Sequence, residues 1–177
     1  MVRPPASAST LRVRQALTWD GVLLPSIEDS AGELFRGLPD LHWIADDVSA
    51  PAAFHAALIA EGTVWVGESA EAGVVGFLTA QAFGSELHVW TLAVHRSFQR
   101  RGLGRRLIAA ATEHARKTGL VALTLTTFRD VPWNGPFYRG LGFETADGAR
   151  LEALLAQEAA RGLPDRCALR LEVFANR

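Results

Sequence analysis

The chain has 177 residues and a formal net charge of −1 at pH 7; 49% of its residues are hydrophobic and 21% are charged. This composition is typical of a soluble globular protein, and the length allows one domain with a substantial core. The near-neutral charge argues against a nucleic-acid-binding domain, and no apolar stretch reaches the roughly 18 residues of a membrane span. Cys167 is the single cysteine, which excludes an intrachain disulfide and favours the reducing cytoplasm.

The first ten residues differ in composition from the rest of the chain. Residues 1–10 contain Pro4, Pro5 and several Ser and Ala residues, and they lack the apolar core of a signal peptide. We therefore expect a flexible leader over 1–10 and a single domain over 11–177. The five histidines are scattered without the spacing of metal ligands, which predicts no structural metal.

The first half of the chain reads as strands and helices separated by glycine and proline. Alternating apolar and polar residues indicate strands, Pro25 interrupts a helical pattern, and Gly62 ends another one. The expected elements are, in order, a strand over 11–16, an interrupted helix or two short helices over 20–38, a helix that begins at 49–51 and runs to 61, and strands over 63–68, 74–82 and 86–94.

In the second half, helices alternate with strands. One helix follows a glycine turn and buries Leu103, Leu107 and Ala111 on one face until Gly119 closes it. The remaining expected elements are a strand over 121–127, a short helix around 137–138, a helix over 148–161 and a strand over 167–174. Because an early run of strands is followed by strands that alternate with helices, the order predicts an α/β fold with a mixed sheet.

A basic turn with two glycines lies between the strand over 86–94 and the long helix. A helix start leaves several N–H groups without intrahelical partners, and its dipole adds partial positive charge there. Gly102 and Gly104 allow positive φ and a close approach of an anion, and the arginines around them add charge. The turn therefore predicts a site for a phosphorylated ligand, although a loop with a solvated arginine face would carry the same residues.

Two well-known phosphate motifs do not fit this turn. A dinucleotide fingerprint needs a third glycine, and Leu107 stands at that position; a P-loop needs Gly-Lys followed by Ser or Thr, and residues 104–106 are Gly-Arg-Arg. A nucleic acid is also a poor partner, because the whole chain is near neutral. A small anionic ligand fits best.

The turn, Gln99-x-x-Gly102-x-Gly104 after the strand Leu92-Ala93-Val94, resembles the acyl-CoA motif of the GNAT family of N-acetyltransferases. A second segment, Phe137-Tyr138-Arg139-Gly140-Leu141-Gly142-Phe143, is similar to the late tyrosine segment of the same family. The resemblance implies a mixed, mostly antiparallel twisted sheet flanked by helices, the acyl-CoA N-acyltransferase fold. It also implies acetyl-CoA as co-substrate and no metal.

The resemblance further implies how acetyl-CoA would be held. The main chain of the turn would bind the pyrophosphate, a bulge in 92–94 would separate that strand from the next, and an N–H near Ala93 would polarise the thioester carbonyl. The alternative for 92–94 is a plain core strand. The residues implied in cofactor binding are Leu92, Ala93, Val94, Gln99, Arg100, Arg101, Gly102, Leu103, Gly104, Arg105, Asn134 and Tyr138.

Three residues are candidates for proton transfer. Tyr138, a phenol that stays protonated at neutral pH, matches the family's acid for the leaving thiolate, although an aromatic residue on a helix is often core packing. His88 stands four positions before Leu92, where histone-type relatives carry a glutamate base, and Glu86 shares its strand face. A solvated strand face would explain the last two residues as well.

Asn134 shows where the resemblance is weaker. The commoner family pattern has an asparagine seven residues before the tyrosine, and here Val131 stands at that position. Asn134, four residues before Tyr138, would either cap the short helix or contact the cofactor.

The acceptor would be recognised by the first helices and their loop. This region is rich in acidic and aromatic residues, which suit a cationic amine, although a solvated loop explains them equally well. They are Glu28, Asp29, Glu33, Asp40, His42, Trp43, Asp46 and Asp47. The resulting hypothesis is transfer of an acetyl group to a primary amine of a small molecule by direct attack.

Two alternatives to this hypothesis stay open. One is a protein N-terminal or lysine acetyltransferase, and the other is a non-catalytic acyl-CoA-binding sensor. A homodimer is possible, and neither a nucleic acid nor a membrane is an expected partner.

Overall fold

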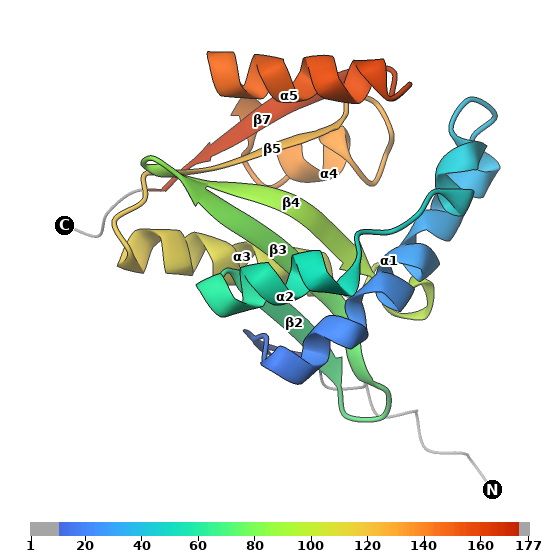
Figure 1. The fold of residues 1–177 in the computed structure, drawn as a ribbon, viewed down its shortest axis with the longest axis vertical. Helices are drawn as coiled ribbons and strands as arrows, with labels where there is room; N and C mark the ends of the chain where they lie inside the picture. Colours follow the sequence, from blue (N-terminus) through green and yellow to red (C-terminus); the bar gives the residue numbers. More distant parts are fainter. Residues whose placement is uncertain (1–10, 174–177) are drawn as a thin grey trace, which may run out of the picture. The chain divides into compact units, whose positions relative to one another are not determined.

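The computed structural model describes residues 11–173, and its strands form one seven-stranded sheet in the order β1-β2-β3-β4-β5-β7-β6 (Figure 1). Pairing is antiparallel for β1–β2, β5–β7 and β6–β7 and parallel for β4–β5. The strands are β1 (Leu11–Gln15), β2 (Val64–Ser69), β3 (Gly73–Phe83), β4 (Glu86–Val94), β5 (Ala122–Phe128), β6 (Glu144–Thr145) and β7 (Arg166–Glu172). The expected mixed α/β sheet is confirmed.

The helices follow the sequence expectations in number and order with small shifts at their ends. The α-helices are α1 (Leu24–Gly32), α2 (Ala52–Glu61), α3 (Leu103–Lys117), α4 (Gly135–Arg139) and α5 (Ala149–Ala160). Short 3-10 helices occupy η1 (Thr18–Val22), η2 (Glu33–Gly37), η3 (His42–Asp46) and η4 (Arg96–Phe98). None of the helices within residues 11–173 is long and apolar enough to cross a membrane.

The segment over 20–38 forms separate short helices, one of its two expected forms, because η1 ends at Val22 and α1 begins at Leu24. Pro25 lies in the first turn of α1, where its missing N–H has no intrahelical partner to lose. The two-residue strand β6 was not expected, because two residues carry too little pattern to be recognised. The expected leader and the end of the expected last strand, Phe174, lie outside the described residues.

The described chain divides into two compact units, each of which we describe by itself. Unit 1 contains residues 11–78 and 92–107, and unit 2 contains residues 79–91 and 108–173. The strands β3 and β4 and the helix α3 each contribute residues to both units.

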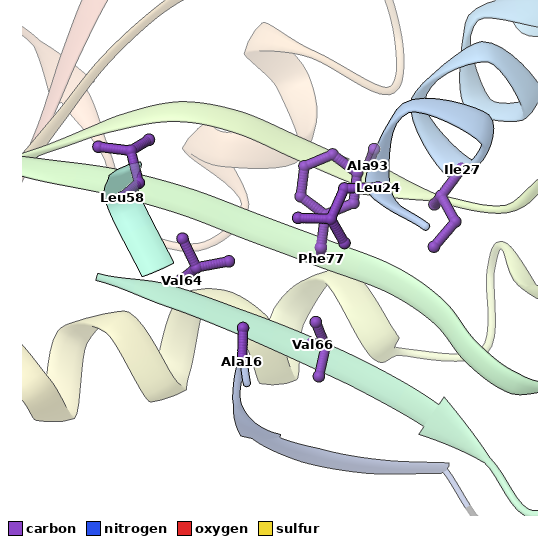
Figure 2. Close-up of a cluster of buried hydrophobic side chains, with 8 residues drawn as sticks. All are labelled: Ala16, Leu24, Ile27, Leu58, Val64, Val66, Phe77 and Ala93. Atoms are coloured by element: carbon purple, nitrogen blue, oxygen red, sulfur yellow. The ribbon is translucent and has the colours of Figure 1, made fainter. Parts of the chain in front are cut away.

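Unit 1 is built around the ring of Phe77 on β3. Leu24 and Ile27 of α1 and Ala93 of β4 belong to the same buried cluster, together with residues of α2 and β2 (Figure 2). Burial of each large apolar side chain contributes about 1.5–3 kcal/mol. Helix α1 is therefore held against the end of β4 by apolar packing.

Unit 2 is built around β5, whose side chains are buried along most of its length. Its partner β7 pairs with it over seven positions, and α5 packs on both strands. Glu158 of α5 accepts hydrogen bonds from Arg166 of β7 at 2.9 Å and from Thr126 of β5 at 2.6 Å. These charge-assisted bonds tie the helix to the two strands.

Candidate active site

The basic turn in unit 1 has the backbone conformation of an anion-binding loop. Arg100 has φ 59° and Gly102 has φ 80°, so two residues just before α3 adopt left-handed geometry. A Cβ at Gly102 would meet no atom within 4 Å, so the space beside this main chain is open. Backbone N–H groups in such a turn at a helix start form a concavity that suits an anion.

Buried anchors hold this turn in place. The side chain of Leu103, 1% exposed, fills the space left by Gly67 on β2 and Gly76 on β3, where a Cβ would lie 2.5 and 2.9 Å from it. Gln99 Nε2 donates a hydrogen bond of 2.9 Å to the carbonyl of Val94, which ties the turn to the end of β4. Sequence reasoning did not single out Gly67 or Gly76, although glycine inside a strand often marks a close approach.

The arginines of the turn divide into bound and unbound side chains. Arg101 Nη2 donates to the Ser97 carbonyl at 2.9 Å, and Arg106 Nη1 donates to the Leu11 carbonyl at 2.8 Å. Arg100 and Arg105 are exposed and form no hydrogen bond or ion pair with any residue between 11 and 173. These two guanidinium groups are available to an anionic ligand.

Residues 92–94, which the resemblance assigns to thioester binding, form the end of β4 and lie beside Gly76 of β3. In unit 1, a Cβ on Gly76 would lie 3.1 Å from the Ala93 carbonyl oxygen, so only glycine leaves the space at that point. In unit 2, β4 pairs with β5 from Glu86 to His88. Among the residues of unit 2, the β4–β5 pairing does not continue beyond His88, which agrees with the expected separation of the two strands.

Tyr138 lies in unit 2 on α4 and is 8% exposed. Phe137 and Phe143 pack edge-on against its ring at centroid distances of 5.1 and 5.5 Å. Burial raises the pKa of the Tyr138 hydroxyl well above its ordinary value, with only a small opposing effect of the Arg166 charge. The phenol therefore stays protonated and can act only as a proton donor near neutral pH.

Asn134 precedes α4, but its side chain does not cap the helix, so that expectation is wrong. Its Nδ2 donates instead to Thr127 Oγ1 at 3.0 Å, and its backbone carbonyl accepts from the Tyr138 N–H at 3.1 Å. Its buried Oδ1 has no hydrogen-bond partner among the described residues. Asn134 thus links β5 to the start of α4 and leaves one acceptor unsatisfied.

His88 is 1% exposed, and its Nδ1 lies 3.0 Å from Thr124 Oγ1. The same hydroxyl oxygen accepts a hydrogen bond of 2.9 Å from Arg150. Burial, aided by the Arg150 charge, lowers the pKa of His88 to about 3. The expected near-neutral pKa of a catalytic base does not hold for this imidazole.

Glu86 is engaged by two cations in unit 2. Arg170 Nε donates to one carboxylate oxygen at 2.8 Å, and Arg150 Nη2 lies 3.6 Å from the other. The neighbouring strand residue Trp90 donates its Nε1–H to Gln81 at 3.3 Å. The polar side chains of this strand segment therefore each have a partner on another element.

The acidic residues of the first helices also differ in their partners. Arg36 binds Glu33 and Asp46, each at 2.9 Å. Glu28 has a different environment, because its Oε2 accepts from the Ala50 N–H at 3.3 Å and lies 3.8 Å from His55 Nε2.

Comparisons with known proteins agree with the geometry of the turn. Residues 28–143 match the family model described as the acetyltransferase (GNAT) family. A curated relative, the N-alpha-acetyltransferase RimI of Mycobacterium tuberculosis (strain ATCC 25618 / H37Rv), is 32% identical over 106 residues, which span 58% of this chain and 65% of the relative.

Solved structures share the fold at low sequence identity. The PaiA N-acetyltransferase of Thermoplasma acidophilum, crystallised with coenzyme A, has a TM-score of 0.71 and 14% identity; 92% of this chain and 99% of that one are covered. The ribosomal-protein-S18-alanine N-acetyltransferase of Escherichia coli has a TM-score of 0.68 and 18% identity, with 95% and 97% covered. Since the family model spans both the glycine turn and Tyr138, this chain belongs to the acetyltransferase (GNAT) family.

Proposed function

We propose that the protein transfers an acetyl group from acetyl-CoA to a primary amine, and that the acceptor is the α-amine of a protein N-terminus. The main support for acetyl transfer is the turn before α3. Its backbone is left-handed and open, and it lies within the residues that match the family model. The similarity to RimI, an N-alpha-acetyltransferase, supports the choice of acceptor. A small-molecule amine is the second candidate.

The residues of the turn fit the pyrophosphate of acetyl-CoA. Main-chain N–H groups from Gln99 to Gly104 would bind its oxygens, and the unbound guanidinium groups of Arg100 and Arg105 would add charge. When bound, acetyl-CoA supplies a thioester carbonyl carbon that a neutral amine can attack.

Two further groups would act on the thioester. An N–H near Ala93 would polarise the carbonyl, and an oriented donor of this kind contributes about 2.7–4 kcal/mol to transition-state stabilisation. Tyr138 would donate its proton to the leaving sulfur, since burial keeps the phenol protonated.

A thiol-release assay over an acceptor panel tests this proposal. The panel contains short peptides with a free N-terminus, the same peptides with a blocked N-terminus and a free lysine, and small amines. We expect release with the free N-terminal peptides and none with the blocked ones. Release with small amines alone would select the second candidate, and tight acetyl-CoA binding without release from any amine would contradict catalysis.

A further inference from the structure

A carboxylate and an imidazole face each other inside unit 1. Glu28 on α1 and His55 on α2 approach within 3.8 Å between Oε2 and Nε2. The Glu28 side chain is 27% exposed, whereas that of His55 is 0% exposed. Glu28 therefore lies at the edge of the unit, with the imidazole behind it.

His55 does not act as a counter-cation for this carboxylate. The ring is buried, its ring nitrogens form no short side-chain hydrogen bond with a described residue, and Phe54 and Phe77 pack edge-on against it. Burial lowers the pKa of His55 below its ordinary value, against a smaller effect of the Ala50 backbone, so the imidazole is neutral near pH 7. A neutral imidazole beside a carboxylate can share a proton with it.

No cation of the described residues faces Glu28. The titratable groups beside it are His55 on α2 and Asp29 on its own helix, and the Ala50 N–H is its hydrogen-bond donor. Burial raises the pKa of Glu28 to about 7, against the effect of the Ala50 N–H and with a small contribution from Asp29. By contrast, Glu33 and Asp46 bind Arg36, and Glu86 binds two arginines.

The helix that carries Glu28 packs against the strand end that the family motif assigns to the thioester. Leu24 and Ile27 of α1 share a buried cluster with Ala93 of β4 (Figure 2). The hydroxyl of Ser30, also on α1, accepts a hydrogen bond of 3.2 Å from the Arg96 N–H. All of these residues lie in unit 1, so Glu28 is on a helix that contacts the end of β4 and the residues that follow it.

We propose that Glu28 binds the ammonium form of the acceptor amine and accepts one of its protons, with His55 as a positioning residue for the carboxylate. This inference rests on the proposed function. The positive charge of the acceptor would supply the cation that the carboxylate lacks in the chain itself.

The proton transfer balances as follows. One N–H bond of the ammonium breaks, its electron pair stays on nitrogen, and the proton forms an O–H bond with Glu28. The neutral amine then forms a C–N bond with the carbonyl carbon, and the C–S bond breaks with its electron pair on sulfur. The nitrogen loses a second proton to water, and the thiolate takes the proton of the Tyr138 hydroxyl and becomes a thiol. Water then returns a proton to Tyr138, and Glu28 gives its proton to water. A base with a pKa near the working pH suits the first step.

The test compares Glu28→Gln with Glu61→Gln, the same chemical change at an exposed position at the end of α2. Acetyl-CoA affinity, melting temperature and kcat/KM between pH 6 and 9 are measured with the acceptor that the wild-type protein uses best. We expect Glu28→Gln to lower kcat/KM by about 10²–10⁴-fold at pH 7, with acetyl-CoA affinity unchanged. The loss should shrink as pH rises, because more acceptor is then already neutral. Glu61→Gln should behave as wild type.

A second variant tests the positioning role. His55→Gln places an amide donor beside the carboxylate, which should lower the pKa of Glu28 and move the acidic limb of the kcat/KM profile to lower pH. An unmoved limb in a folded His55→Gln variant overturns the positioning role. An active wild-type protein whose Glu28→Gln variant keeps full kcat/KM overturns this inference alone, whereas a wild-type protein inactive with every amine overturns the proposed function.

Discussion

The glycine turn and the start of β4 both carry polar residues that the sequence analysis selects as site candidates. The two regions differ in whether these side chains have partners within the chain. In the turn, Arg100 and Gly102 are left-handed, and the Arg100 and Arg105 side chains form no polar contact with a described residue. At the start of β4, His88 binds Thr124 and Glu86 binds arginines. A ligand site needs groups that the chain itself leaves unsatisfied, and of these two regions the turn offers them.

This difference also separates what sequence can and cannot predict. The turn is readable because its glycines, arginines and helix start are adjacent in the chain, and local backbone chemistry decides its conformation. The fate of Glu86 depends on Arg170, which is 84 positions away, and that of His88 on Arg150. Glycine spacing does not reveal such partners, so the base candidates could be placed on one strand but not judged as bases.

The same distinction between local pattern and distant contacts applies to the fold. Long periodic elements such as α3 and β5 were predicted with ends shifted by one or two residues, whereas the two-residue β6 was missed. Asn134 was expected either to cap α4 or to contact the cofactor; its side chain does not cap the helix, and its amide donates to Thr127 of β5. Local pattern predicts elements; contacts between elements decide side-chain roles.

The largest expected effect on activity concerns Tyr138. Burial keeps the hydroxyl group of this residue protonated. Tyr138→Phe retains the ring that packs on Phe137 and Phe143 and removes only the proton donor. We expect kcat to fall by about 10²–10⁴-fold and the acetyl-CoA dissociation constant to stay unchanged. Steady-state kinetics and calorimetry measure the two quantities, and unchanged turnover would show that Tyr138 is a packing residue only.

A smaller effect, on acetyl-CoA affinity, is expected when a substitution strains the backbone of the turn. Gly102→Ala forces an L-residue into φ 80°, and the matched variant Gly84→Ala does the same at φ 58° in the loop between β3 and β4. Each substitution costs roughly 1–2 kcal/mol in its folded conformation. Acetyl-CoA binding should weaken by about 5- to 30-fold in Gly102→Ala alone, as seen by calorimetry. Equal weakening in both variants would remove the special role of the turn.

The two unbound arginines should have a moderate effect on affinity. Arg100→Ala and Arg105→Ala should each weaken acetyl-CoA binding by about two- to fivefold at low salt, because exposed charge pairs contribute little and salt screens them. The melting temperature should not change, since neither side chain contacts a described residue. Arg106→Ala, which loses a bond to the Leu11 carbonyl, is the contrasting variant and should lower stability.

The smallest effect on catalysis is expected at the start of β4. His88→Gln can keep a hydrogen bond to Thr124, so kcat/KM should stay within a few-fold of wild type. Because the pKa of His88 is about 3 when folded and near 6.5 when unfolded, the unfolded state binds more protons between these values. The free energy of unfolding should therefore fall as pH drops below about 6.5, and less steeply in His88→Gln. Chemical denaturation at several pH values measures the slopes, and a large loss of kcat/KM would restore His88 as the base.

The most direct measurement of the central claim is a crystal structure with acetyl-CoA bound. We predict that the pyrophosphate accepts hydrogen bonds from main-chain N–H groups of residues 99–104, with Arg100 or Arg105 beside it. Binding of the pyrophosphate at another basic cluster, such as Arg150 and Arg170 beside Glu86, would contradict it.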